Sequence, residues 1–114
     1  MISASLVKAS LAGNLIMVEV QFKNTGDEIA RNLTINRVTT MVLEGEGGLL
    51  LKDPTLPFQV GNIDKGKTAN VTFVFQSARA NAVWKFVMDE IGTVQDAVGW
   101  PYPVSAEQDV TAKP

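Results

Sequence analysis

Carboxylates are the main residues in this sequence whose types and spacing could do chemistry, because the chain has no histidine and no cysteine. The usual general base, the thiol nucleophile and the imidazole or thiolate metal ligands are therefore missing. Paired carboxylates can still hydrolyse a glycosidic bond. The candidate pairs are Asp27 with Glu28, Glu44 with Glu46, and Asp89 with Glu90.

None of these pairs has the surroundings of a catalytic dyad. Adjacent acids on a strand point to opposite faces of the sheet. The other acids lie in predicted loops, with no apolar pocket to raise a pKa. We interpret all three pairs as solvated charge, and we predict that the chain is not an enzyme and needs no cofactor.

Calcium binds through oxygen ligands alone, so acids from these pairs are also candidates for a metal site. Asp27 and Glu28 in one loop, or Glu44 and Glu46 in another, could each contribute two ligands. Neither cluster has the dense alternating aspartates of a dedicated calcium loop. We favour ordinary surface acids and predict no metal site, although the spacing alone leaves calcium open.

Trp100 and Tyr102 are the aromatic residues best suited to bind a ligand. They alternate with Pro101 and Pro103, which fix φ and hold the chain extended. An indole and a phenol presented at the rim of a sandwich could stack on sugar rings. The alternative, which we favour, is structural: Trp100 caps the open end of the core and Tyr102 anchors an edge strand that the prolines protect from pairing.

The elements that position these residues are predicted from two-residue alternation. Residues 15–23 alternate apolar and polar side chains, as a strand with one buried face requires, and residues 69–75 repeat the pattern. The apolar faces consist of Ile16, Val18, Val20 and Phe22 in the first segment, and Ala69, Val71, Phe73 and Phe75 in the second. Two such strands separated by turn-rich segments indicate an all-β, antiparallel β-sandwich.

About seven strands are expected along the chain. They cover residues 2–10, 15–23, 30–38 with an extension to 43, 49–51, 69–76, 82–91 and 100–111. Pro54 and Pro57 exclude a central ladder position, so the short segment 49–51 is expected at an edge. Residues 61–67 are predicted to be a turn, and residues 95–99 a hairpin turn.

Residues 82–91 fit two patterns. Trp84, Phe86 and Met88 alternate as in a strand, whereas Trp84, Val87, Met88 and Ile91 have the spacing of an amphipathic helix. The β-branched and aromatic content favours the strand.

Length and charge narrow the function class. A chain of 114 residues suits a single domain spanning 1–114, large enough for a core without a metal or disulfide. The net charge of −2 with interspersed signs argues against nucleic acid as a partner. No apolar run approaches the roughly 20 residues of a membrane span, and the start of the chain lacks a signal-peptide pattern, so no membrane insertion is expected.

Two runs resemble a known family. VEVQFKNTGDEIARNLTINRV and LPFQVGNIDKGKTANVTFVF are similar to the bacterial immunoglobulin-like modules of the cell-adhesion-related type and their fibronectin-like relatives. The shared positions are Asn24, Gly26, Ala30, Asn32, Leu33, Leu56, Pro57, Gly61, Ile63 and Gly66. The resemblance covers roughly residues 15–76 and implies an immunoglobulin-like sandwich in which Trp84 is buried. It also implies an extracellular or cell-surface, non-catalytic module of a larger bacterial protein.

Two function hypotheses follow. The first is a structural or protein-interaction module, a spacer or adhesion-type domain that contacts neighbouring domains or other proteins. Met17, Val74 and Val87, which the alternation places on outward faces, would then cover a partner. The second is a carbohydrate-binding module that holds polysaccharide with Trp100 and Tyr102. That hypothesis requires an exposed Trp100, coplanar with another aromatic ring and flanked by polar groups such as Gln95 and Asp96.

Overall fold

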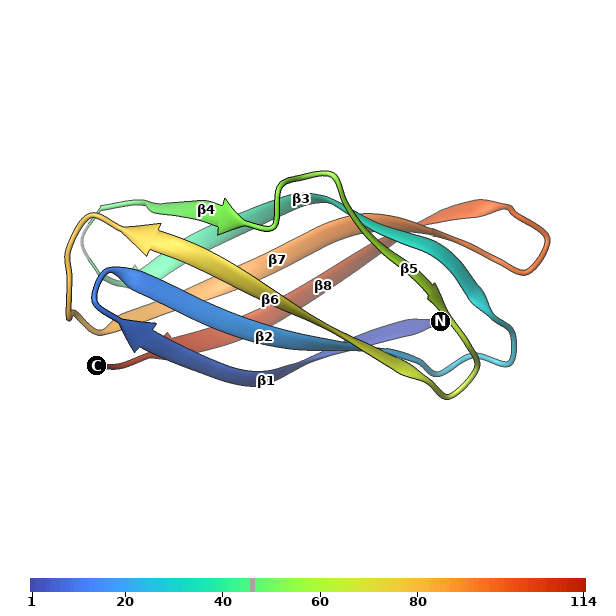
Figure 1. Cartoon of the computed structure of the whole chain (residues 1–114), viewed down its shortest axis with the longest axis horizontal. Coiled ribbons are helices and arrows are strands. Elements are labelled where there is room, and N and C mark those ends of the chain that lie inside the picture. The colour runs from blue at the N-terminus through green and yellow to red at the C-terminus, as the bar shows by residue number, and fades with distance from the viewer. Residues whose placement is uncertain (46) are drawn as a thin grey trace.

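Antiparallel strands make up most of the molecule. The computed structural model describes residues 1–45 and 47–114, and these residues form eight strands and no helix (Figure 1). The strands are β1 (Ile2–Ala12), β2 (Leu15–Asn24), β3 (Ala30–Glu44), β4 (Leu49–Asp53), β5 (Phe58–Ile63), β6 (Thr68–Ser77), β7 (Trp84–Gln95) and β8 (Pro101–Ala112). The prediction of an all-β fold is confirmed.

The strands pack as two layers. One sheet has the order β1-β2-β6-β4 and the other the order β5-β3-β7-β8, with antiparallel pairing throughout. The predicted β-sandwich is therefore correct. β5 is the strand that the sequence analysis missed, because Pro57 and Gly61 gave the segment the composition of a turn. Gly61 has φ +102° inside β5, and the turn itself is confined to residues 64–67.

The stretch 82–91 is strand, not helix. β7 begins at Trp84 and alternates buried and outward residues up to Gln95. Because Trp84, Phe86 and Met88 all face the interior, the strand prediction and the buried position of Trp84 are confirmed. β4 is likewise an edge strand, as the flanking prolines predicted.

The core lies between the inner faces of the two sheets. Phe75 of β6 and Phe86 of β7 meet there edge to face, with ring centroids 5.6 Å apart. The buried apolar residues are Ile16, Val18, Val20, Phe22, Ala30, Leu33, Ile35, Ile63, Val71, Phe73, Phe75, Trp84, Phe86, Met88, Val94, Val110 and Ala112. The alternation in 15–23 and 69–75 thus named the inner faces of β2 and β6 correctly.

A β-bulge changes which residues of β1 face the core. The register with β2 shifts between Leu6 and Lys8, so Val7 is the extra residue. Before the bulge the inward residues include Leu6, and after it they include Ala9 and Leu11. Without the extra residue, Lys8 would have pointed inward; with it, Lys8 lies on the outer face of the sheet.

The two termini lie toward different ends of the molecule. The sandwich measures 46 × 21 × 19 Å, and its N-terminus and C-terminus lie toward opposite ends of the long axis (Figure 1). β1 and β8, the first and last strands, run in the same direction at the edges of their sheets (Figure 1).

Asn24, at the end of β2, joins the loops near the N-terminus. Its side chain is fully buried and donates hydrogen bonds from Nδ2 to the carbonyl oxygens of Glu28, at 2.7 Å, and Ile63, at 2.9 Å. Oδ1 accepts a hydrogen bond from the amide of Gly26 at 3.0 Å. One amide group therefore satisfies backbone atoms of both the β2–β3 loop and β5.

The substitution Asn24→Ala is expected to lower the free energy of unfolding by about 2–4 kcal/mol, because it leaves buried backbone groups without partners. The matched control is Asn70→Ala, which removes an exposed side-chain hydrogen bond to Glu19 and should cost less than about 0.5 kcal/mol. Urea unfolding of both variants measures the difference. Equal losses would show that the Asn24 network is not a structural centre.

Candidate functional site

The tip of the β7–β8 hairpin is an ordered loop that Asp96 holds together. Asp96 Oδ1 accepts hydrogen bonds from the backbone amides of Val98, at 3.0 Å, and Trp100, at 2.9 Å. The Asp96 amide donates to the Trp100 carbonyl, and the Gly99 amide donates to the Asp96 carbonyl. Gly99 has φ +91°, a conformation that favours glycine. The loop thereby takes one defined shape at the end of the hairpin (Figure 1).

The loop presents two apolar side chains to solvent. Trp100 is 73% exposed and Val98 is 78% exposed. The expectation that Trp100 caps the open end of the core is therefore wrong. The reason is that β8 begins at Pro101, so Trp100 still belongs to the loop and lies beyond the last pair of the ladder, Gln95 with Pro101.

Tyr102, in contrast, is half-buried on the face of β8 that is turned toward the core. It pairs with Val94 of β7, and its side chain packs against the hydrophobic core. Within the described residues, the recorded ring contact is that of Phe75 with Phe86, so Trp100 has no coplanar aromatic neighbour there. The two candidate residues are close in sequence but do not form a common aromatic surface.

The polar groups beside the tip are engaged with the protein itself. Gln95 Oε1 accepts a hydrogen bond from Asn32 Nδ2 at 3.0 Å. The backbone N–H of Asn32 in turn donates to Asn62 Oδ1 at 3.0 Å, and Asn32 has φ +53°. Asp96 is likewise hydrogen-bonded to its own loop. The side-chain oxygens of Gln95 and Asp96 that make these bonds are therefore already engaged within the protein.

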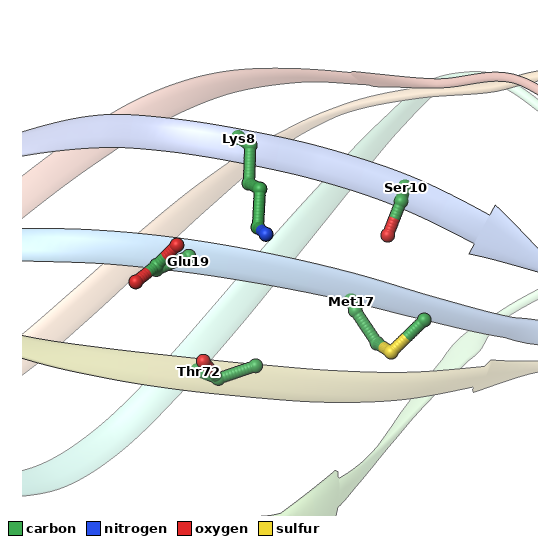
Figure 2. Close-up of a pocket in the computed structure, with 5 residues that line it drawn as sticks. All are labelled: Lys8, Ser10, Met17, Glu19 and Thr72. Atoms are coloured by element: carbon green, nitrogen blue, oxygen red, sulfur yellow. The ribbon is translucent and has the colours of Figure 1, made fainter.

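A shallow pocket of about 370 Å³ lies on the outer face of the β1-β2-β6-β4 sheet (Figure 2). Figure 2 shows Lys8 extending from β1 toward β2. The lining residues are Lys8, Ser10, Met17, Glu19 and Thr72. Sequence analysis missed this pocket because Lys8 faces outward only through the bulge at Val7, which carries no glycine signal.

The lining of this pocket is chemically mixed. Lys8 and Glu19 are register partners, and Glu19 also accepts a hydrogen bond from Asn70 Nδ2 at 3.1 Å. A cation and an anion side by side cancel each other's field, so the pocket has no strong preference for a charged ligand. Met17 lies on the outward face, as the alternation predicted.

Glu90 is the most unusual ionisable group. Its side chain is 1% exposed on the inner face of β7, and within the described residues neither carboxylate oxygen has a hydrogen-bond partner. Burial raises the pKa of Glu90 from 4.5 to about 8, and the charge of Asp89 adds to the rise. The prediction that this acid is solvated is wrong.

Asp89, the neighbour of Glu90, points the other way. It accepts a hydrogen bond from Ser105 Oγ at 3.1 Å on the outer face. The expectation that these adjacent acids face opposite sides is confirmed. Because the sheet separates the two carboxyl groups, they cannot act together on one bond.

The candidate calcium ligands do not gather into a larger acidic cluster within the described residues. Glu28 contributes its carbonyl oxygen to the Asn24 network, and Glu44 lies 3.6 Å from Lys85 Nζ. Glu46 falls outside the described residues. No group of three or more acidic side chains that could hold a metal ion occurs in residues 1–45 and 47–114.

Comparison with known proteins gives no assignment: no family model matches the chain, and no curated protein matches it either. In the part of the chain that the structure describes, no helix is long and apolar enough to cross a membrane.

Glu90 should make stability depend on pH. The folded chain keeps the proton up to about pH 8, whereas the unfolded chain releases it above 4.5. The free energy of unfolding therefore falls as pH rises between these values, by about 5 kcal/mol, and levels off above them. Glu90→Gln should remove this slope.

The measurement is urea unfolding of the wild type and Glu90→Gln across this pH range. Glu107→Gln, at an exposed acid on β8, is the control and should follow the wild type. A wild-type profile parallel to that of Glu90→Gln would contradict a protonated Glu90.

Proposed function

We propose that the chain is a non-catalytic structural or protein-interaction module of a larger extracellular or cell-surface protein. The observation that carries the proposal is the position of the two termini, toward opposite ends of the long axis of a sandwich that measures 46 Å (Figure 1). A module with this geometry adds its length to a string of domains. Domains whose ends lie close together would instead branch from it.

The terminal strands are also suited to carry tension. β1 is paired with β2 along its length, and β8 is paired with β7 from Pro101 to Ala112. The hydrogen bonds of an antiparallel ladder are perpendicular to the strands. Pulling the ends apart along the long axis therefore loads these bonds in shear, so that many must break together.

The two loaded strands are coupled to each other. Gln108 Nε2 of β8 donates a hydrogen bond to the carbonyl oxygen of Ala4 in β1 at 3.1 Å. β1 and β8 run in the same direction, so opposite forces on the two termini slide one past the other (Figure 1). This contact adds a side-chain bridge between the sheets at the strands that bear the load.

The resemblance to bacterial immunoglobulin-like modules agrees with this proposal. It supplies the cell-surface location and the neighbouring domains or other proteins as partners. The first residue of the shared pattern, Asn24, is the one whose side chain binds the β2–β3 loop and the end of β5.

Single-molecule pulling tests the proposal. The chain has no cysteine, so introduced cysteines give unique handles. Pulling from N-terminus to C-terminus should require a clearly higher force than pulling between Ala80→Cys and the C-terminus. The second geometry opens the β7–β8 ladder from its Trp84–Ala112 end, where hydrogen bonds break one at a time.

Ala80 is exposed and lies before β7, so the cysteine should not perturb the fold. Denaturation of the variant in urea provides that control. A force for end-to-end pulling equal to or below the force for the second geometry would overturn the tension-bearing role.

A second candidate function is polysaccharide binding, and the observation in its favour is the exposed Trp100 on a loop that Asp96 holds in place. A flat indole fixed in solvent can stack on a sugar ring. Since Tyr102 packs on the core, Trp100 would act without it.

Trp100→Ala is expected to abolish retention on insoluble polysaccharides if this second function holds. Tyr102→Phe, which keeps the ring in the core and removes the hydroxyl, should retain binding. Pull-down of the three folded proteins against a polysaccharide panel decides between them. No retention of the wild type would eliminate the second candidate.

A further inference from the structure

One stretch of β3 has a sheet neighbour on one side only. β7 pairs with β3 from Arg31 to Glu44, whereas β5 pairs with it only from Ala30 to Ile35. β4 follows in the chain but belongs to the other sheet. On the side away from β7, residues 36–44 therefore form an open edge, where no other strand of the described chain pairs with their backbone groups.

The other edges of the sandwich carry features that block strand addition. β1 has its bulge followed by Lys8, and β8 has Pro101 and Pro103 at its start and the exposed charges of Glu107 and Asp109 further along. β4 is short and ends in Lys52 and Asp53, and β5 is short and follows Pro57. Bulges, prolines, lysines and short length are the usual devices that prevent edge-to-edge pairing.

The middle of the β3 edge lacks these devices. It consists of Val38, Thr39, Thr40, Met41 and Val42, a run of mostly β-branched residues without charge or proline. Met41 is 59% exposed on the outer face of the sheet. Such a segment is a template for another strand.

The sequence of this edge is complementary to itself in the antiparallel direction. About a two-fold axis at Thr40, Val38 of one copy lies opposite Val42 of the other, and Thr39 lies opposite Met41. The pairs join residues of the same face, because Val38 and Val42 are half-buried and Thr39 and Met41 are exposed. A regular ladder requires this match of faces.

The charges at the two ends of the edge also match. Leu43 and Glu44 together take one step of the ladder, because the register with β7 shifts between Val42 and Glu44. Arg37 of one copy then lies opposite Leu43 and Glu44 of the other. Opposite charges facing each other across strands stabilise the pair, and the partner of Glu44 in its own chain, Lys85, is itself exposed.

We propose that residues 36–44 of β3 pair antiparallel with the same residues of a second copy, about a two-fold axis at Thr40. The pairing joins the two β5-β3-β7-β8 sheets into one continuous sheet and covers part of Met41 and Leu43. This inference rests on the interaction role proposed above and names the partner as a second copy of this chain.

The association is expected to be weak. One pair of edge segments buries less surface than the roughly 1,200–2,000 Å² of a standard stable interface. A weak contact of this kind becomes effective when many copies are held on one surface, because each contact raises the local concentration for the next.

Sedimentation velocity over a wide range of protein concentration tests the proposal. The wild type should shift from monomer to dimer as concentration rises. Met41→Lys should remain monomeric, because the new ammonium groups lie near each other across the axis. The matched control is Leu50→Lys, at a 61% exposed residue of β4 in the other sheet, which should dimerise like the wild type.

Charge reversal tests the register. Arg37→Glu and Glu44→Arg should each weaken the dimer, and the double variant should restore it. A wild type that stays monomeric at every concentration would overturn the proposal. So would a dimer that survives Met41→Lys, or single reversals that the double variant does not rescue.

These results are separable from the proposed function. Single-molecule pulling is done on isolated molecules, where no dimer forms. A monomeric chain with high resistance to end-to-end force would overturn the self-pairing and leave the tension-bearing role intact. A chain that dimerises but unfolds at low end-to-end force would support the self-pairing and overturn the tension-bearing role.

Discussion

The contact between Phe75 of β6 and Phe86 of β7 shows the constraint on which the sandwich depends, namely that each sheet must bury one face against the other. The two rings come from different sheets and meet edge to face in the centre of the core. The inward apolar residues of both sheets belong to the same core cluster, so any strand that changed parity without compensation would expose its apolar residues. The chain adjusts parity with bulges, as at Val7 in β1 and at Leu43 in β3.

That constraint also explains the cost of Glu90. It occupies the inner face of β7 by the same alternation that buries Phe86 and Met88. A carboxyl group at such a position can remain in the core at neutral pH only by keeping its proton. The free energy of unfolding therefore decreases as pH rises. The sheet that contains Glu90 is the one whose β3 edge we propose to pair with a second copy.

Much of the fold was predictable because the strands alternate cleanly. Ile16 to Phe22 and Val71 to Phe75 identified their buried faces correctly, and the same rule extended along β7 would have placed Glu90 in the core. Residue type overrode periodicity there, since an acid is ordinarily solvated. β5 and the bulge at Val7 were missed because neither leaves a strong local signal. For the candidate site, the sequence indicated the loop before β8, but whether Trp100 faced core or solvent depended on the exact first residue of β8, and boundaries are the least predictable feature of a strand.

The opposite placement of the two tryptophans gives the chain two built-in optical probes. Trp84 is fully buried in the core, and Trp100 is 73% exposed at the hairpin tip. Emission from the first reports on the integrity of the packed interior, because its indole loses its apolar surroundings only when the sheets separate. The indole of Trp100 is accessible to aqueous quenchers, and its emission changes when a ligand or partner covers the hairpin tip. Quenching by iodide therefore divides the fluorescence of the native chain into a core signal and a surface signal without any added label.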